Sequence, residues 1–153
     1  MPSCDSETLE KCVQDPAQAL LHWEALVECV ASDEESKLES ATEALENCGS
    51  LPESELPRLT QLLSNPSPSS LGPQRLYWLC TLAGRFGGSG LPLQPWIAAI
   101  VVDASIDLAA RERAAWCLGE LGPVDPQRIA LLKQSMIGAP ERLRRLIEVA
   151  TGS

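Results

Sequence analysis

The sequence predicts an all-α fold of the α-α superhelix class, a short solenoid of about eight or nine helices in antiparallel pairs. Leu and Ala, two strong helix formers, dominate the 153 residues, whereas Phe and Tyr occur once each. Apolar residues recur at offsets of three, four and seven, which places them on one face of a helix. This pattern ends in a glycine three times, at intervals of 38 and 35 residues, close to the period of helix-pair repeats.

The N-terminal region predicts helices between residues 5 and 31. Asp5 or Ser6 is suited to cap a short helix that ends near Val13. Pro16 is suited to the first turn of a longer helix that runs through Ala31. Residues 32–35, Ser-Asp-Glu-Glu, then predict a loop with a capping box for the next helix. The apolar stripe of the longer helix consists of Leu20, Trp23, Leu26, Val27 and Val30.

Three glycine-terminated segments predict the first helix of each repeat. They are Ser40–Gly49, Trp78–Gly87 and Arg113–Gly122. The glycine is suited to the position after a helix, where a left-handed backbone ends it. The apolar positions that correspond are Ala41, Ala44, Leu45 and Cys48, then Leu79, Leu82, Ala83 and Phe86, then Ala114, Cys117, Leu118 and Leu121.

A second helix is predicted after each glycine. Pro52, Pro92 and Pro123 lie just beyond it, and proline is tolerated in the first turn of a helix. Ten residues after the glycine the side chain is Leu or Ile, and fourteen residues after it the side chain is Leu, Val or Met. A third position is apolar in the first and last repeats, but the middle repeat has Gln94 there. The predicted repeats span about residues 35–64, 72–103 and 107–137.

Residues 110–122 carry a recognisable pattern, Ala-Arg-Glu-Arg-Ala-Ala-Trp-Cys-Leu-Gly-Glu-Leu-Gly. They resemble the first helix of a HEAT-like (armadillo-type) repeat of the bacterial kind, whose loose pattern is Arg-x-x-Ala-x-x-x-Leu-Gly-x-x-Gly. Gly84 and Gly87 repeat the end of this pattern, whereas Glu46 replaces the inner glycine of the first repeat. The resemblance implies a scaffold and says little about function. The residues that fill the pattern are Arg111, Ala114, Leu118, Gly119 and Gly122.

The remaining segments fit one domain over residues 1–153. Residues 64–73 are rich in Ser and Pro and predict a flexible link, too short to separate two domains. A last helix is predicted over residues 140–151, and we expect it to cap the open end of the solenoid by packing against the helix at residues 125–137. Its apolar residues are Leu143, Leu146, Ile147 and Ala150.

The charge is uneven along the chain. The net charge is −9; residues 1–56 hold fourteen acidic and two basic residues, and residues 57–153 hold seven acidic and ten basic ones. Because phosphate neutralisation dominates nucleic-acid binding, the acidic third makes nucleic acid an unsuitable partner. No run of about 18 apolar residues exists, so we expect no membrane span. The N-terminus has neither a basic nor an apolar leader region, so we expect no secretory signal and a cytoplasmic protein.

Neither metal chemistry nor catalysis is predicted. The six cysteines form no CxxC pair, and His22 has no neighbour at metal-ligand spacing, so we expect no metal and no cofactor. A catalytic triad would have to use His22, which lies mostly off the apolar stripe of its helix. The glycine-rich stretch at residues 84–90 follows a helix and not a strand, which argues against a phosphate loop. We therefore predict that the protein is not an enzyme.

An enzyme-related protein remains the alternative. The resemblance implies it, because HEAT-like folds also include DNA-base glycosylases and chromophore-lyase-type proteins. A glycosylase would need a basic, aromatic-lined groove. The arginines that are candidates for such a groove are Arg58, Arg75, Arg85, Arg111, Arg113 and Arg128.

The leading hypothesis is a non-enzymatic interaction or scaffold module that binds a protein or peptide partner through the solenoid surface. Trp78 and Trp116 lie off their apolar stripes, so each is either packed between repeats, which we favour, or a binding hot spot. Glu39 and Glu43 lie on one helix face, which we favour as solvated rather than as a docking patch for a basic partner. Polar residues on the second helices that are open to a partner include Arg58, Gln61, Gln94, Arg128, Lys133 and Gln134. The candidate partner-binding residues are Trp78, Trp96, Trp116, Arg58, Arg128, Lys133, Glu39 and Glu43.

Overall fold

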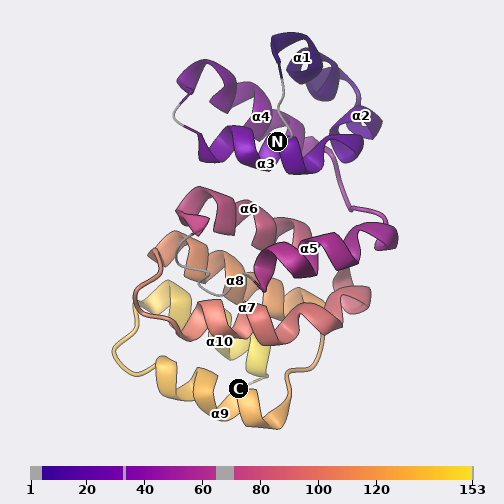
Figure 1. Ribbon diagram of the computed structural model, residues 1–153. Coiled ribbons are helices and arrows are strands. Elements are labelled where there is room, and N and C mark those ends of the chain that lie inside the picture. Colours follow the sequence, from indigo (N-terminus) through magenta and orange to yellow (C-terminus); the bar gives the residue numbers. More distant parts are fainter. Residues whose placement is uncertain (1–4, 33, 65–70, 153) are drawn as a thin grey trace. The chain divides into compact units, whose positions relative to one another are not determined.

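The computed structural model describes residues 5–32, 34–64 and 71–152, and these residues form helices without any strand (Figure 1). The predicted all-α fold is confirmed. Most of the predicted link at residues 64–73 lies outside the described residues. Contacts divide the chain into two compact units, Met1–Leu51 and Pro52–Ser153. The single domain over residues 1–153 stays a prediction.

In the first unit, α4 packs against both α1 and α3. Asp5 begins α1 as predicted, because its carboxylate accepts a hydrogen bond from the Thr8 amide at 2.8 Å. Asp15 caps α2 in the same way through the Ala17 amide. Small side chains at Ala41 and Ala44 are fully buried, which lets neighbouring helices approach α4 closely. The helices are α1 (Ser6–Gln14), α2 (Pro16–Leu21), α3 (Trp23–Ala31) and α4 (Glu35–Asn47).

Two local predictions for the first unit are wrong. The single helix predicted from Pro16 to Ala31 is two helices, because His22 leaves the helical conformation at φ −108° and ψ 23°. The capping box predicted at residues 32–35 does not form, since Glu34 precedes α4 without a side-chain cap bond. Asp33, which is part of that prediction, lies outside the described residues. The predicted end of α4 is correct, with Gly49 in the left-handed region at φ 77°.

The second unit stacks its helices in two layers (Figure 1). One layer holds α6, α8 and α10, with α8 packed against the other two. The other holds α7 and α9, which pack on each other, while α7 also packs on α8 and α5 packs on α6. This alternation is the arrangement of a helix-pair solenoid. The helices are α5 (Leu56–Leu63), α6 (Pro73–Gly84), α7 (Gln94–Val102), α8 (Leu108–Leu121), α9 (Pro126–Ser135) and α10 (Glu141–Thr151), with 3₁₀ segments η1 (Glu53–Glu55) and η3 (Gly87–Leu93).

The second and third predicted repeats correspond to α6 with α7 and to α8 with α9. The helices of the first predicted repeat, α4 and α5, belong to different units, so that repeat stays a prediction. Within the middle repeat the predicted boundaries are wrong: α6 ends at Gly84 and not near Phe86, and a 3₁₀ segment runs to Leu93 before α7 begins.

Gln94, which breaks the apolar pattern, is buried and not open to a partner as predicted. Its side-chain nitrogen donates to the Pro123 carbonyl at 2.9 Å, and its side-chain oxygen accepts from the Asp125 amide at 3.1 Å. A buried amide must satisfy its donors and acceptors, and this one does so on the loop that joins α8 to α9. Gln94 therefore ties two consecutive repeats together.

The capping helix α10 begins after Pro140 and ends at Gly152, which is left-handed at φ 72°. Leu143 and Ile147 are fully buried, and Leu146 and Ala150 are half-buried. The predicted contact with α9 is present, but α10 packs more extensively on α8, which the sequence did not predict. In a stacked solenoid each helix packs on the equivalent helix of the preceding repeat, and for α10 that helix is α8.

Candidate functional site

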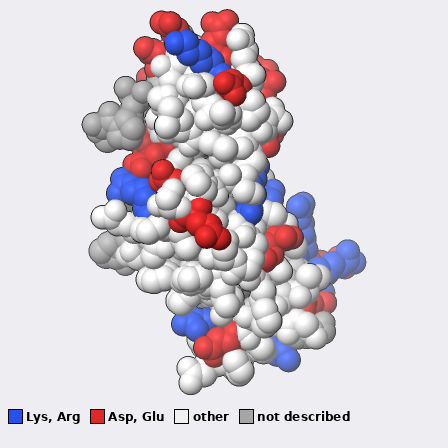
Figure 2. Space-filling model, turned by 90° about the vertical axis from the view of Figure 1, so that its right-hand side faces the viewer, with Lys and Arg blue, Asp and Glu red and all other residues white. Residues whose placement is uncertain are grey.

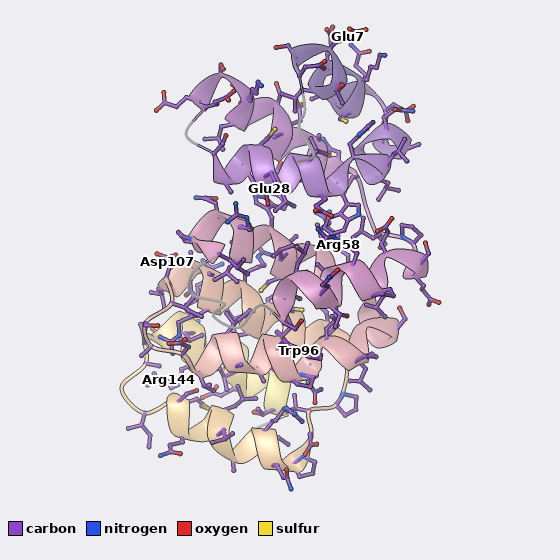
Figure 3. The ribbon with its side chains drawn as sticks, viewed as in Figure 1. Glu7, Glu28, Arg58, Trp96, Asp107 and Arg144 are labelled. Atoms are coloured by element: carbon purple, nitrogen blue, oxygen red, sulfur yellow. The ribbon has the colours of Figure 1, made fainter. Side chains whose placement is uncertain are left out.

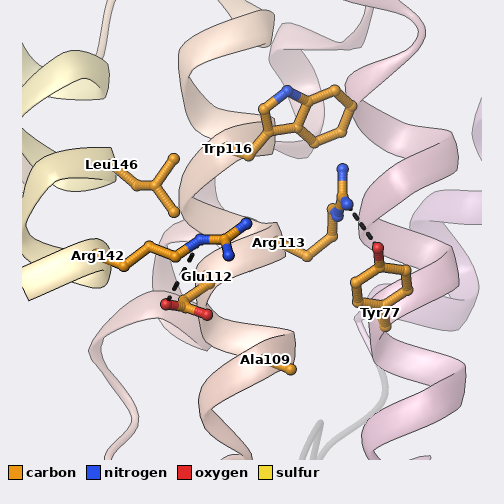
Figure 4. A pocket seen from close by; sticks show the side chains of 7 residues that line it. All are labelled: Tyr77, Ala109, Glu112, Arg113, Trp116, Arg142 and Leu146. Atoms are coloured by element: carbon orange, nitrogen blue, oxygen red, sulfur yellow. Dashed lines mark hydrogen bonds and ion pairs between the residues drawn. The ribbon is translucent and has the colours of Figure 1, made fainter. Parts of the chain in front are cut away.

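A pocket of about 280 Å³ opens on the layer formed by α6, α8 and α10 (Figure 4). Four of its residues come from α8, at positions 109, 112, 113 and 116. Offsets of three, four and seven place them on one helix face, which differs from the buried face of α8. The other lining residues come from the helices on either side. The lining residues are Tyr77, Ala109, Glu112, Arg113, Trp116, Arg142 and Leu146.

Arg113 lies at the centre of this pocket. Its guanidinium carbon is 4.6 Å from the centroid of the Tyr77 ring and 4.8 Å from that of the Trp116 ring. It also donates a hydrogen bond to the Tyr77 hydroxyl (Figure 4). Both rings attract the cation through their negative faces. The guanidinium is thus held between side chains of two successive helices of one layer.

Trp116 is half-buried and packs against Gly84 of α6. A Cβ atom at Gly84 would lie 2.4 Å from Cζ3 and 2.8 Å from Cη2 of the Trp116 ring, so only glycine leaves room for it. Trp116 therefore packs between consecutive repeats and also lines the pocket, whereas its role as a binding hot spot stays a prediction.

Glu112 and Arg142 form the wall of the pocket towards α10. Arg142 Nε lies 3.9 Å from Glu112 Oε2, and the Arg142 side chain is 80% exposed whereas that of Glu112 is 18% exposed. An ion pair that long and that exposed contributes little stability. Two arginines and one glutamate leave the pocket with a net charge of +1.

The two units differ in net charge. Residues 1–51 hold twelve acidic and two basic residues, a net charge of −10, whereas residues 52–153 hold nine acidic and ten basic residues, a net charge of +1. On the face in Figure 2, acidic side chains predominate over the first unit, whereas both signs are scattered over a largely uncharged surface of the second.

A second pocket, of about 190 Å³, lies on the other layer, between α7 and α9. Its lining is mostly apolar, and Leu131 at its edge is 58% exposed. Arg128 is its only charged lining residue among those described, and it pairs with Asp125 at 3.2 Å. The lining residues are Pro95, Ala98, Ala99, Val102, Arg128, Leu131 and Leu132.

The structure scatters the eight predicted binding residues. Trp116 lines the first pocket, Arg128 lines the second, and Trp78 is buried, in an edge-to-face contact with Tyr77. Half-buried Trp96 lies on α7, whereas exposed Arg58, which donates to Gln61 at 2.9 Å, lies on α5 (Figure 3). The rest are exposed: Lys133 lies on α9, as does Arg128, and Glu39 and Glu43 lie on α4.

The arginines proposed for a glycosylase groove are also dispersed. Arg113 lines one pocket and Arg128 the other, whereas the Arg111 side chain donates to the Val101 carbonyl at 2.9 Å. The remaining three line neither pocket: Arg58 lies on α5, Arg75 on α6 and Arg85 directly after the end of α6.

Sequence reasoning missed most of the first pocket. Tyr77, Ala109, Glu112 and Arg142 were not among the predicted binding residues, and Leu146 was assigned to packing. One signal was available, because the spacing of positions 109, 112, 113 and 116 defines a second face of α8. The neighbours of that face depend on how α6 and α10 dock, which no local pattern contains.

His22 is the one histidine of the sequence, and a catalytic triad would have to use it. His22 is half-buried at the junction of α2 and α3. Within the described ranges, no three His, Cys, Asp or Glu side chains are grouped to hold a metal ion. None of the helices in those ranges combines the length and apolar character needed to span a bilayer. Cys4 lies outside the described residues, and the other five cysteines are free and buried.

We expect the thiols of Cys80 and Cys117 to be unreactive in the folded protein. Burial raises the pKa of Cys80 to about 12, although nearby Arg113 lowers it slightly, and burial raises the pKa of Cys117 well above its ordinary value. The thiolate is the reactive form. Iodoacetamide at about pH 8 should therefore leave both residues unmodified in native protein and modify them in urea, as read by peptide mass spectrometry. Equal labelling in both states would contradict the burial of these residues.

Comparisons of the chain with protein-family models, with curated proteins and with solved structures find no match. The likeness of residues 110–122 to a HEAT repeat therefore stays a resemblance of motif.

Proposed function

We propose that this chain is a HEAT-like, non-enzymatic interaction module that binds a protein or peptide through the layer of α6, α8 and α10. One observation supports this most: the first pocket is lined by side chains from three successive helices of a stack. A surface built across repeats is the usual binding surface of solenoid proteins. Tyr77, Arg113 and Trp116 are also of the three residue types most enriched at interface hot spots.

The cysteines support the cytoplasm as the location of this module. The described cysteines are free, as is usual in a reducing compartment. The proposed surface lies on the first helices of the repeats and not on the second, because Gln94 is engaged with the next repeat and Arg128 pairs with Asp125.

The test is an affinity pull-down from the source cell with three forms of the full chain. The baits are the unmodified chain, Ala109→Gln and Ala99→Gln. Ala109 is an exposed helical residue that lines the first pocket, and Ala99 is one that lines the second. Each substitution therefore fills a different pocket. We expect a partner protein that the unmodified chain and Ala99→Gln retain and that Ala109→Gln loses. Circular dichroism of each bait checks that it is folded.

Two results would contradict the proposal. Recovery of only nucleic acid or of a small-molecule product would overturn the interaction function. A partner that Ala99→Gln loses and Ala109→Gln retains would overturn the choice of surface, in favour of the groove between α7 and α9.

A further inference from the structure

We infer that the pocket on α6, α8 and α10 binds a carboxylate of an acidic protein segment, which pairs with the guanidinium of Arg113 while an adjacent apolar side chain contacts Trp116 and Leu146. This inference rests on the proposed function and names the chemistry of its partner. The side chains that it concerns all belong to described residues of the second unit (Figure 4).

Arg113 is a cation without an internal counter-charge. Among the described residues no carboxylate forms an ion pair with it, and only the Tyr77 hydroxyl accepts a hydrogen bond from its guanidinium. A guanidinium has five N–H donors, so most of its donors remain for water or a ligand. Its side chain is half-buried at the pocket, where solvent screens a new ion pair less than on an open surface.

The two aromatic rings restrict the Arg113 side chain before a partner binds. An arginine loses considerable rotational freedom when it is fixed, and this cost normally weakens a surface ion pair. Here Tyr77 at 4.6 Å and Trp116 at 4.8 Å already hold the guanidinium. A preorganised guanidinium suits a carboxylate especially well, because two parallel N–H groups meet two oxygens.

The charge of the pocket selects a single carboxylate rather than a polyanion. Glu112 is 3.9 Å from Arg142, so it partly compensates that arginine and leaves a net charge of +1. Nucleic-acid binding needs several phosphate contacts, and a chain with a net charge of −9 repels a polyanion. Leu146, Ala109 and the Trp116 ring provide an apolar wall beside Arg113. Together these features fit Asp or Glu next to an apolar residue.

The test measures binding of two small probes to the ¹⁵N-labelled full chain by NMR. The probes are N-acetyl-Glu-Leu-amide and N-acetyl-Gln-Leu-amide, which differ only in the charge of one side chain. We expect saturable shifts of the Trp116 indole N–H signal with the Glu probe, and a dissociation constant at least about tenfold weaker with the Gln probe. Because this comparison uses the unmodified chain, it is valid whether or not a variant folds.

A matched pair of variants then assigns the effect to Arg113. Arg113→Gln should abolish the preference for the Glu probe, whereas Arg128→Gln, the same change beside the second pocket, should keep it. Equal affinity for the two probes, or a preference that survives Arg113→Gln, overturns the inference. Saturable shifts of the Trp116 indole signal with inorganic phosphate but not with the Glu probe would also overturn the inference. The same holds if the signal shifts only with the concentration of the protein and not with that of the probe.

The two experiments fail separately. If a partner is lost only with Ala109→Gln and the two probes bind equally, the acidic nature of the partner is rejected and the interaction function is retained. If the Glu probe binds selectively but the pull-down recovers only nucleic acid or a small-molecule product, the interaction function is rejected and the carboxylate site is retained.

Discussion

Truncation after Gly138, which removes α10, should lower the free energy of unfolding by several kcal/mol and expose an apolar face on α8. Leu143 and Ile147 are fully buried and Leu146 is half-buried, and α10 contacts α8 extensively. Burying an aliphatic side chain of this size contributes about 1.5–3 kcal/mol before the entropy of ordering is subtracted. A typical domain is stable by only about 5–15 kcal/mol, so the loss is a large fraction of the total.

Urea denaturation and light scattering measure the effect of the truncation. A lower urea midpoint, or aggregation through the uncovered face, is the expected result. A truncated chain that stays monomeric and unfolds at the same urea concentration would show that α10 does not stabilise the solenoid.

A pair of point variants separates the packing of α10 from its mere presence. Leu143→Ala should destabilise the protein by about 2–5 kcal/mol, because it leaves a cavity against the neighbouring helices. Val149→Ala is the matched control on the same helix, since Val149 is 76% exposed, and its effect should stay within about 0.5 kcal/mol. Similar losses from both variants would contradict the packing described for α10.

Gly84→Ala should destabilise the protein by about 1–3 kcal/mol relative to Gly119→Ala. Both glycines lie in the last turn of a helix of the first layer, so alanine changes helix propensity similarly at the two positions. Their surroundings differ. A Cβ at Gly84 would lie 2.4 Å from the Trp116 ring, whereas a Cβ at Gly119 would meet its nearest neighbour, Cγ1 of Val149, at 3.9 Å, an ordinary contact.

Urea denaturation of the two glycine variants beside the unmodified chain tests this difference. Gly119→Ala should leave stability unchanged or raise it by up to about 1 kcal/mol. Equal stability of the two variants would show that Trp116 does not pack against Gly84 as described. The comparison also bears on the pocket, because the ring that Gly84 accommodates is one of the two that hold Arg113.

The predictable part of this molecule is the part with a local cause. Helical periodicity and caps act between residues a few positions apart, so the all-α class and the left-handed glycine after α4 were predicted correctly. The break at His22 was missed, because the apolar stripe continues from Leu20 to Trp23 across it. The capping box predicted before α4 did not form, because a matching local sequence does not oblige the backbone to adopt the conformation that the cap bond needs.

Tertiary structure alone decided the candidate site. The face of α8 that carries Arg113 and Trp116 can be derived from spacing in the sequence, but Tyr77 lies 36 residues before Arg113 and meets it only because α6 packs on α8. The same holds for Gln94, whose partners at Pro123 and Asp125 lie in the next repeat. By itself the sequence determined that the chain is helical and which face of most helices is apolar, because those properties follow from local periodicity, but it did not determine every helix boundary. Which polar side chains of different helices meet depends on the register of helix on helix, and only the packed structure sets that register.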